Sequence, residues 1–558
     1  MGFLICNVVQ FGGIGVKLIR LMPFLAFVIL MAVLCFCITG TNRLSAVYGT
    51  EGESTRTEKE KEAPDVTLKI FIDNFYFTQS EWGKDLTSRK ISASTGVKLE
   101  VEIPADPEDG RSRINLMMST NQYPDLIMLS RSELSRKLVA NNAVIPVDRL
   151  IEQDGKDILQ NVTMDYLKKY CREVDGRIYG LPNGVKWKDE YPQYGSGILL
   201  LKSVHKMLGS PEIKNTGDLY NYLSKIKNLG FQNYQGVEIT PAYMDWPPSA
   251  LCTSFGIPLI NVDGSAYVYA QDGRIHHALR DKEMKEAYRY TNKLFREGLI
   301  DQDWFVQPKE DVYKKLLNGR IAVYFAYDAQ GFLMEYERQM EKLSGDSYFL
   351  IEPPLAPGVK KNGGNYISDA QWTQVYITSQ CKDPAGAMKF LNWMASEEGQ
   401  YTAAIGPEET VWTMDPQGAP ILTPEFAVRL STDRDRANRE IGLMQWNFQQ
   451  NYKYWKNSVF ALMAPEEQKN FKEYSAMIAK GLWTNPVLEP LFYSSGWNAE
   501  AVNSAINVYI SRAEKQIYMA ADDAAFEALY GETLAGAEGL GLETLENELN
   551  ARIENQGS

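Results

Sequence analysis

Histidine is nearly absent from this chain. Its 558 residues include 3 histidines, namely His205, His276 and His277. Adjacent side chains cannot point the same way on a helix or a strand, so His276 and His277 do not form a paired metal or general-base site. This scarcity argues against zinc chemistry and against hydrolysis that depends on a histidine base.

Cysteine is scarce as well. The 6 cysteines fall into two groups, three near the start (Cys6, Cys35, Cys37) and three scattered over the rest (Cys171, Cys252, Cys381). An odd number at irregular spacing gives neither a disulfide framework nor a metal-ligand pattern. We expect the last three to be separate buried thiols and expect no metal site.

The chain also lacks a positive excess and the short motifs of common enzymes. Its 58 Lys and Arg against 71 Asp and Glu give a net charge of -13, which argues against nucleic acid or an anionic surface as the main partner. The glycines at 12–15 and 536–541 are not phosphate loops, since the first group precedes an apolar run and the second follows no strand. No nucleophile elbow occurs, and no cofactor is expected.

An uncharged apolar run from Leu21 to Ile38 follows Lys17 and Arg20. This order is typical of an export signal, so the folded body is expected to work outside the cytoplasm. The run is also long enough to span a bilayer, which leaves a retained anchor as the alternative. Residues 1–49 are therefore predicted to be a signal peptide or a membrane anchor.

The leader contains several candidate positions for cleavage or lipidation. Small residues suited to cleavage occur at 44–46 and 47–49. Cys35 and Cys37 lie where a bacterial lipoprotein carries its acylated cysteine, although Leu34 and Phe36 precede them in place of small residues. Residues 50–64 are charged and poor in apolar side chains, as expected of a polar tether to the membrane.

The residues after the tether alternate between strand and helix patterns. Residues 66–71 and 97–103 alternate as strands, 78–94 favour a helix, and 126–129 form a short apolar run typical of a buried strand. Strands that alternate with helices predict a parallel sheet and an α/β fold.

Helix signals follow farther along the chain. Asp281 is suited to cap a helix that stops at Gly298, and Asp383 with Pro384 is suited to begin a helix that runs toward Gly399. Residues 321–325 and 375–377 have strand patterns between these helices. From about Thr423 the chain is predicted to be mostly helical.

Several phrases occur in an order that is shared with a known family. They are Tyr123–Ile127, Val144–Ile151, Asp175–Pro182, Leu317–Val323 and Asp383–Trp393. In this order the chain resembles the extracellular solute-binding proteins, family 1, of bacterial ABC sugar importers. Residues 515–529 resemble the closing segment of the long Gram-positive lipoprotein branch of that family.

The resemblance implies an α/β, two-lobed periplasmic-binding-protein-like fold (type II) with a helix-rich C-terminal part. The first lobe would hold residues 65–194 and 370–412, and the second would hold 195–369 and 413–558. The chain would cross between lobes near 197–200, 374–376 and 411–412. The ligand would bind in the cleft, and the lobes would close over it.

A carbohydrate cleft needs flat aromatic rings and short polar groups. The chain has 11 Trp and 31 Tyr, and several lie in loops. The predicted ligand-binding residues are Asn74, Tyr76, Trp187, Tyr191, Tyr243, Asp245, Trp246, Tyr327, Asp328, Asp369 and Trp372. Asn74 and Tyr76 follow the first strand at the carboxyl edge, where open α/β sheets bind ligands. For each aromatic residue the alternative is packing in the core.

The predicted function is capture of a carbohydrate, an oligosaccharide given the chain's size, and its delivery to the transmembrane subunits of an ABC permease. The protein would act as a monomer at the outer face of the cell membrane and would catalyse no reaction. An exported glycoside hydrolase or lyase stays open, because two well-placed carboxylates suffice for it. A non-catalytic adhesin and a peptide or other polar ligand are further alternatives.

Overall fold

The computed structural model describes residues 66–73, 81–184, 195–245, 249–371, 373–493 and 499–555. All of them belong to one compact unit, Glu62–Ser558. The predicted leader and tether, with Cys35 and Cys37, lie outside the described residues.

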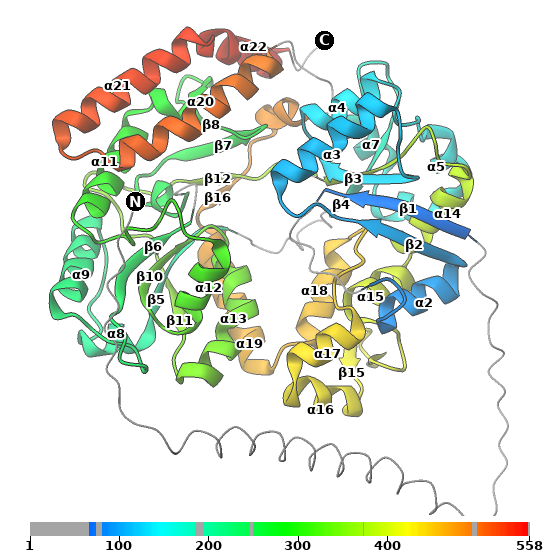
Figure 1. The fold of residues 1–558 in the computed structure, drawn as a ribbon, viewed down its shortest axis with the longest axis horizontal. Helices are drawn as coiled ribbons and strands as arrows, with labels where there is room; N and C mark the ends of the chain where they lie inside the picture. Colours follow the sequence, from blue (N-terminus) through cyan, green and yellow to red (C-terminus); the bar gives the residue numbers. More distant parts are fainter. Residues whose placement is uncertain are drawn as a thin grey trace, which may run out of the picture. The chain divides into compact units, whose positions relative to one another are not determined.

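Sheet 1 is built mainly from the first part of the chain (Figure 1), in the order β2-β1-β3-β13-β4. Its strands are β1 (Val66–Ile72), β2 (Val97–Glu102), β3 (Leu126–Ser130), β4 (Gly180–Asn183) and β13 (Thr373–Ile377). β1 pairs in parallel with β2 and β3, whereas β13 runs antiparallel to β3 and β4. The strands predicted at 66–71, 97–103, 126–129 and 375–377 are therefore confirmed.

Helices cover both faces of sheet 1 (Figure 1). They are α2 (Leu86–Thr95), α3 (Pro107–Thr120), α4 (Glu133–Ala140), α5 (Asp148–Asp154), α6 (Lys156–Asn161), α7 (Met164–Tyr170), α14 (Pro384–Ala395) and α15 (Glu397–Ile405). On one face Ile70 packs in a core with Leu391 of α14. On the other face Phe71 packs with Ile114 of α3 and Leu138 of α4. Alternate residues of one strand thus supply two cores, as the pleat requires.

Sheets 2 and 3 are built mainly from the middle of the chain. Sheet 2 has the order β11-β5-β10-β6, with β5 (Gly197–Leu201), β6 (Thr240–Met244), β10 (Ile321–Ala326) and β11 (Tyr348–Ile351). Sheet 3 has the order β16-β12-β7-β8-β9, with β7 (Pro258–Val262), β8 (Ser265–Tyr269), β9 (Ile275–His277), β12 (Gly364–Tyr366) and β16 (Leu482–Trp483). The strand predicted at 321–325 is confirmed as β10.

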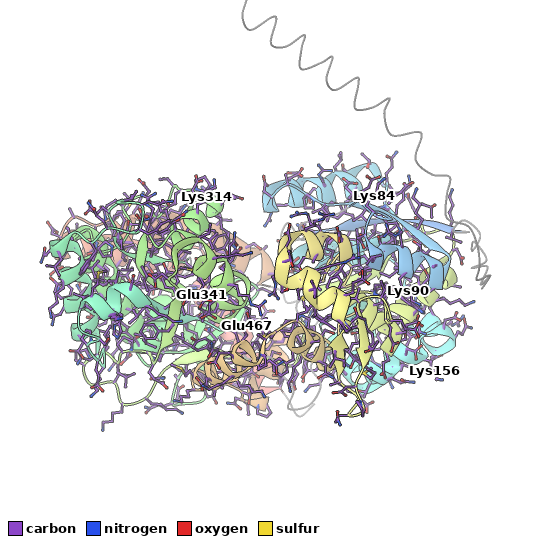
Figure 2. The ribbon with its side chains drawn as sticks, turned by 90° about the horizontal axis from the view of Figure 1, so that it is seen from below. Lys84, Lys90, Lys156, Lys314, Glu341 and Glu467 are labelled. Carbon is purple, nitrogen blue, oxygen red and sulfur yellow. The ribbon has the colours of Figure 1, made fainter. Side chains whose placement is uncertain are left out.

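Many helices accompany sheets 2 and 3. They are α8 (Lys202–Met207), α9 (Thr216–Leu229), α10 (Ser249–Ser254), η1 (Ala278–Arg280), α11 (Lys282–Arg296), α12 (Lys309–Leu317), α13 (Ala329–Ser344), α19 (Pro465–Ala479), η2 (Pro486–Phe492), α20 (Glu500–Tyr518), α21 (Asp523–Gly539) and α22 (Leu542–Glu554). The mostly helical C-terminal part is therefore confirmed. Charged side chains lie on the outside of these helices and of those around sheet 1, as Figure 2 shows for Lys84, Lys90, Lys156, Lys314, Glu341 and Glu467.

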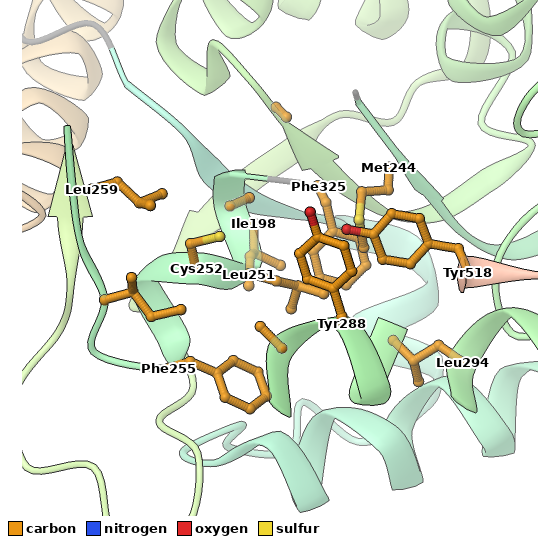
Figure 3. Packing of buried hydrophobic residues seen from close by; sticks show 14 of the residues in the cluster. Ile198, Met244, Leu251, Cys252, Phe255, Leu259, Tyr288, Leu294, Phe325 and Tyr518 are labelled. Atoms are coloured by element: carbon orange, nitrogen blue, oxygen red, sulfur yellow. The ribbon is translucent and has the colours of Figure 1, made fainter. Parts of the chain in front are cut away.

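One core joins the C-terminal helices to sheet 2. Met244 of β6 and Phe325 of β10 belong to the same buried cluster as Tyr288 of α11 and Tyr518 of α20 (Figure 3). The rings of Tyr288 and Tyr518 are stacked, with their centroids 4.8 Å apart. The last helices are therefore packed against the α/β core.

The segment that includes α16 (Pro424–Thr432), α17 (Arg434–Ile441) and α18 (Tyr452–Ala461), with the hairpin β14 (Trp412–Met414) and β15 (Pro420–Leu422), packs with the helices of sheet 1. Phe426 and Ile441 share a core with Tyr401 and Ile405 of α15. The sequence places residues 413–558 together in a second lobe. The apolar faces of this segment are buried against α15, and the division into lobes stays a prediction.

Helix ends follow their capping residues. Asp281 Oδ1 accepts a hydrogen bond of 2.9 Å from the Met284 N–H, and Asp383 Oδ1 accepts one of 2.9 Å from the Gly386 N–H, so both predicted caps are confirmed. The helix predicted from residue 78 begins at Leu86 instead, because Asp85 Oδ1 accepts a hydrogen bond of 2.7 Å from the Ser88 N–H. The helix after Asp383 stops at Ala395, since Ser396 caps α15.

Candidate functional site

The carboxyl ends of β6 and β10 lie side by side in sheet 2. The two strands are parallel, and Tyr243 is paired in register with Tyr324. Paired residues of neighbouring strands point to the same face, so both tyrosines share one face, and their ring centroids are 6.3 Å apart. Met244 and Phe325 follow on the opposite face in the core (Figure 3). The alternation therefore leaves an aromatic pair at this end of the sheet.

Asp245 is the first residue after β6, and hydrogen bonds hold it in place. Its N–H donates to the Phe325 carbonyl at 2.9 Å, and its Oδ2 accepts from the Tyr324 hydroxyl at 2.7 Å and from the Tyr327 N–H at 2.8 Å. Burial raises the pKa of the Asp245 carboxyl, and these hydrogen bonds oppose the shift. With the described residues, Oδ1 forms no hydrogen bond, so it is available to a ligand hydroxyl.

Tyr327 and Asp328 follow β10 and have different roles. The Tyr327 side chain is 59% exposed, although Asp245 fixes its backbone. Asp328 caps α13 by accepting a hydrogen bond of 2.9 Å from the Gly331 N–H to its Oδ1. Tyr327 therefore presents an accessible ring beside Asp245, whereas the geometry of Asp328 serves the helix.

A loop after α11 brings two more aromatic rings to β6. The Asp301 N–H donates to the Ala242 carbonyl at 2.8 Å, and Lys315 Nζ lies 2.6 Å from Asp301 Oδ2. The Lys315 ammonium and three hydrogen bonds outweigh burial and lower the pKa of Asp301. With the loop fixed in this way, the stacked rings of Trp304 and Phe305 have centroids 4.4 Å apart.

A cavity of about 550 Å³ lies where these elements meet α20. It is lined by Tyr243, Trp304, Phe305, Ser511, Arg512 and Lys515. Aromatic rings can stack on the apolar faces of a sugar, and the hydroxyl and cationic groups can bond to its oxygens. We call this cavity, together with Asp245 and Tyr327, the β6–β10 site.

The structure brings together three of the predicted ligand-binding residues, Tyr243, Asp245 and Tyr327, with Asp328 beside them. Asp369 is exposed, and its carbonyl accepts a hydrogen bond of 2.8 Å from the Tyr166 hydroxyl of α7. The other predicted residues lie outside the described part of the chain: Asn74, Tyr76, Trp187, Tyr191, Trp246 and Trp372.

Sequence reasoning missed Tyr324, Trp304, Phe305, Arg512 and Lys515. Trp304 and Phe305 follow Asp301-Gln302-Asp303 directly after a helix, so the reasoning applied to the other loop aromatics applies to them too. No local pattern marks Arg512 or Lys515. They reach the cavity only because α20 packs against the same core as β6.

The scarce residue types have structural roles. His277 is buried, burial lowers its pKa to about 4, and its Nδ1 accepts a hydrogen bond of 3.2 Å from the Leu279 N–H. His276 faces Asp281 instead, at 3.4 Å. Cys171, Cys252 and Cys381 are buried and free of disulfides, as predicted.

Two searches cover only the described part of the chain. Over those residues no cluster of three or more His, Cys, Asp or Glu side chains is arranged to hold a metal ion. Within the same ranges no helix combines the length and the apolar character needed to cross a membrane. The apolar run at 21–38 lies outside them.

Comparison with known proteins gives the family and the fold. Residues 88–407 match the family model of bacterial extracellular solute-binding proteins. The fructooligosaccharide ABC transporter substrate-binding protein FusA of Streptococcus pneumoniae is 26% identical over 319 residues, which are 53% of this chain and 56% of that protein. The chain thus spans about half the length of the curated relative it matches.

Solved structures resemble the chain over a larger part of its length. The alginate-binding protein AlgQ2 without calcium ion has a TM-score of 0.68 at 16% identity, with 88% of this chain and 98% of that chain covered. An EF-hand mutant of FusA from S. pneumoniae in complex with fructo-nystose has a TM-score of 0.68 at 17% identity, with 88% and 99% covered. The predicted α/β, two-lobed fold is confirmed.

Proposed function

The chain belongs to the bacterial extracellular solute-binding proteins, and we propose that it is the substrate-binding component of an ABC importer for an oligosaccharide. The β6–β10 site supports this function best. It combines an accessible ring at Tyr327, a carboxyl at Asp245 that hydrogen bonds hold in place, and a cavity lined by three aromatic side chains. Such a mixture suits a ligand with apolar ring faces and many hydroxyls.

The names of similar proteins support the same ligand class. FusA is named for fructooligosaccharides, and AlgQ2 is named for alginate. Both names refer to chains of sugars, so an oligosaccharide is the ligand that we propose for this chain. The protein would bind and release it without making or breaking a bond.

We propose that closure of two lobes couples binding to transport. A ligand that contacts both lobes stabilises their closed arrangement, which the transmembrane subunits of the permease would recognise. The first lobe would comprise residues 65–194 and 370 to about 462, because α16–α18 pack with α15. The second would comprise 195–369 and the residues after about 463, with the β6–β10 site on it.

The location follows from the leader. An export signal or anchor at residues 1–49 and a polar tether at 50–64 would place the folded unit at the outer face of the cell membrane. A monomer suffices for this function. An exported hydrolase is the alternative, and sugar turnover would distinguish it.

The test is a thermal-shift and calorimetric titration of the purified protein with fructooligosaccharides, manno-oligosaccharides and uronate oligomers. A ligand that binds only the folded state raises the melting temperature, so we expect a saturable increase with one class. No new reducing ends should form during incubation. Cleavage of the sugar would support the hydrolase, and no shift with any sugar would contradict the proposal.

A point substitution ties binding to the β6–β10 site. Tyr327→Ala should weaken binding of the sugar identified in this way by about 1–3 kcal/mol, because the exposed ring loses its stacking contact. Tyr234→Ala is the matched control, since Tyr234 is also on the surface with 50% exposure and does not line the site. Equal affinities for the two variants would remove Tyr327 from the site.

A further inference from the structure

Two cations of α20 line the cavity of the β6–β10 site and have no acidic partner among the described residues. Arg512 and Lys515 both line the cavity of about 550 Å³. They are three residues apart on one helix, which places them on the same face. Among the described residues neither side chain has an ion pair or a hydrogen bond.

Other basic residues in this part of the molecule do have acidic partners. Such pairs are Lys285 and Arg289 with Glu527, Arg296 with Asp523, and Lys315 with Asp301. A chain with a net charge of -13 has ample carboxylates to neutralise its cations. Arg512 and Lys515 differ from these residues, because neither forms an ion pair with a carboxylate of the described residues.

Aromatic side chains line the cavity as well. Tyr243, Trp304 and Phe305 belong to its lining, and Trp304 and Phe305 are stacked. A sugar ring with an apolar face and an anionic group would suit both kinds of side chain, because the face would contact the aromatic rings and the anion would accept charge-assisted hydrogen bonds. We propose that this cavity binds a sugar residue that carries a carboxylate, so that the oligosaccharide of the proposed function is an acidic one.

The acidic groups near the cavity do not oppose this assignment. Asp301 is neutralised by Lys315 at 2.6 Å. Asp245 Oδ2 accepts two hydrogen bonds, and Asp245 is not among the residues that line the cavity. Arg512 and Lys515 therefore set the charge that a ligand meets at the α20 wall.

The experiment compares acidic and neutral sugars of the same length and linkage. The pairs are tetragalacturonate with its carboxyl-reduced tetragalactose and β-1,4-tetramannuronate with mannotetraose, each titrated calorimetrically into the full chain. We expect the acidic member of at least one pair to bind about tenfold or more tightly than its neutral counterpart. This preference should shrink when NaCl is raised from about 50 mM to about 500 mM.

Substitutions in the cavity test whether the preference for acidic sugars arises there. Arg512→Gln with Lys515→Gln should remove the acidic preference, because the affinity for the acidic member should fall by about tenfold more than the affinity for the neutral member. Lys206→Gln with Lys225→Gln is the matched control, since it removes the same charge from exposed lysines that do not line the cavity. That control should keep the preference.

The outcomes separate this inference from the proposed function on which it rests. Binding of neutral sugars with no preference for any acidic member would overturn the inference and leave the proposed function intact. An acidic preference that survives in the Arg512 and Lys515 double variant would also overturn it. Binding of no sugar from the panel would overturn both.

Discussion

The two ends of helix α20 use their charged residues differently. At its N-terminal end Glu500 accepts a hydrogen bond of 2.7 Å from Arg136 Nε of α4, and Arg136 also lies 3.0 Å from Asp263 of the turn between β7 and β8. Near its C-terminal end Arg512 and Lys515 line a cavity, and neither has an ion pair with the described residues. The same helix thus has a paired charge at its N-terminal end and, near its C-terminal end, two cations that form no ion pair with the described residues.

The difference indicates two roles for charge in one element. At the N-terminal end the partners come from elements distant in sequence, so these ion pairs fix α20 against α4 and against sheet 3. Partly buried charges contribute to such a contact only when they are paired. At the C-terminal end no carboxylate of the described residues forms an ion pair with Arg512 or Lys515, which suits binding of an external anion.

The largest expected effect comes from breaking the paired end. Arg136→Met removes the cation that is paired with Glu500, and the Arg136 side chain is 14% and the Glu500 side chain 18% exposed. Loss of one partner of a largely buried pair should lower the free energy of unfolding by about 3 kcal/mol, measured by urea denaturation.

The control for that variant is an exposed ion pair. Arg429→Met breaks the pair with Glu425 in α16, where the Arg429 side chain is 53% exposed. Surface pairs contribute little, so this change should cost less than about 1 kcal/mol. If the two variants lost the same free energy of unfolding, the Arg136–Glu500 pair would be no more stabilising than an exposed surface pair.

The next effect concerns Glu514, which lies between Arg512 and Lys515 in sequence but is turned toward the core. Burial raises the pKa of its carboxyl to about 7, and it accepts a hydrogen bond from the Tyr288 hydroxyl of α11. Tyr518, Tyr530 and Cys252 also lie close enough to interact electrostatically with it. No cation of the described residues is paired with this carboxylate, so the folded state retains its proton to higher pH.

The sign of the pH dependence follows. In the unfolded chain Glu514 ionises near its ordinary pKa of 4.5, whereas the folded protein holds the proton until about pH 7. The stabilisation that this group contributes is therefore fully present below pH 4.5 and is lost as the pH rises through 7. Glu514→Gln should flatten the stability profile in this window and stabilise the protein by about 2 kcal/mol at pH 8. An unchanged profile would contradict the raised pKa.

A smaller effect on stability is expected from a hydrogen bond at the N-terminal end of α20. The Ser504 hydroxyl of α20 donates to Glu133 Oε2 of α4 at 3.0 Å, and Glu133 also pairs with Lys137. Ser504→Ala removes one hydrogen bond and leaves the carboxylate neutralised, so unfolding should become easier by about 0.5–1 kcal/mol. Ser511→Ala, which removes only a bond to the Val508 carbonyl of the same helix, should have a smaller effect.

The features predicted from sequence are those that neighbouring residues determine. The caps at Asp281 and Asp383 and the strands at 66–71 and 321–325 depend on side chains a few residues apart, so their patterns are local. The sequence predicts Tyr243, Asp245 and Tyr327 as ligand-binding residues because they lie in a proline-rich segment or directly after a strand, and that role stays a prediction.

The features that sequence reasoning missed depend on distant contacts. The start of α2 is an exception, because its cap joins Asp85 to Ser88 only three residues away. The hydrogen bond of 3.2 Å that the Trp446 indole N–H donates to the same Asp85 carboxylate does depend on a distant contact. The burial of α16–α18 against α15 and the approach of Arg512 to Tyr243 have no local signal either. Such contacts depend on how remote elements pack, which periodicity and capping patterns do not encode.

The smallest effect on stability is expected from replacing the two cations near the C-terminal end of α20. Arg512→Gln with Lys515→Gln removes two charges but no ion pair with the described residues, so the free energy of unfolding should change by less than about 0.5 kcal/mol. The same urea series used for Arg136→Met measures it. A loss comparable to that of Arg136→Met would mean that these cations stabilise the fold. A negligible loss would mean that their charge contributes little to folding and is available to a ligand.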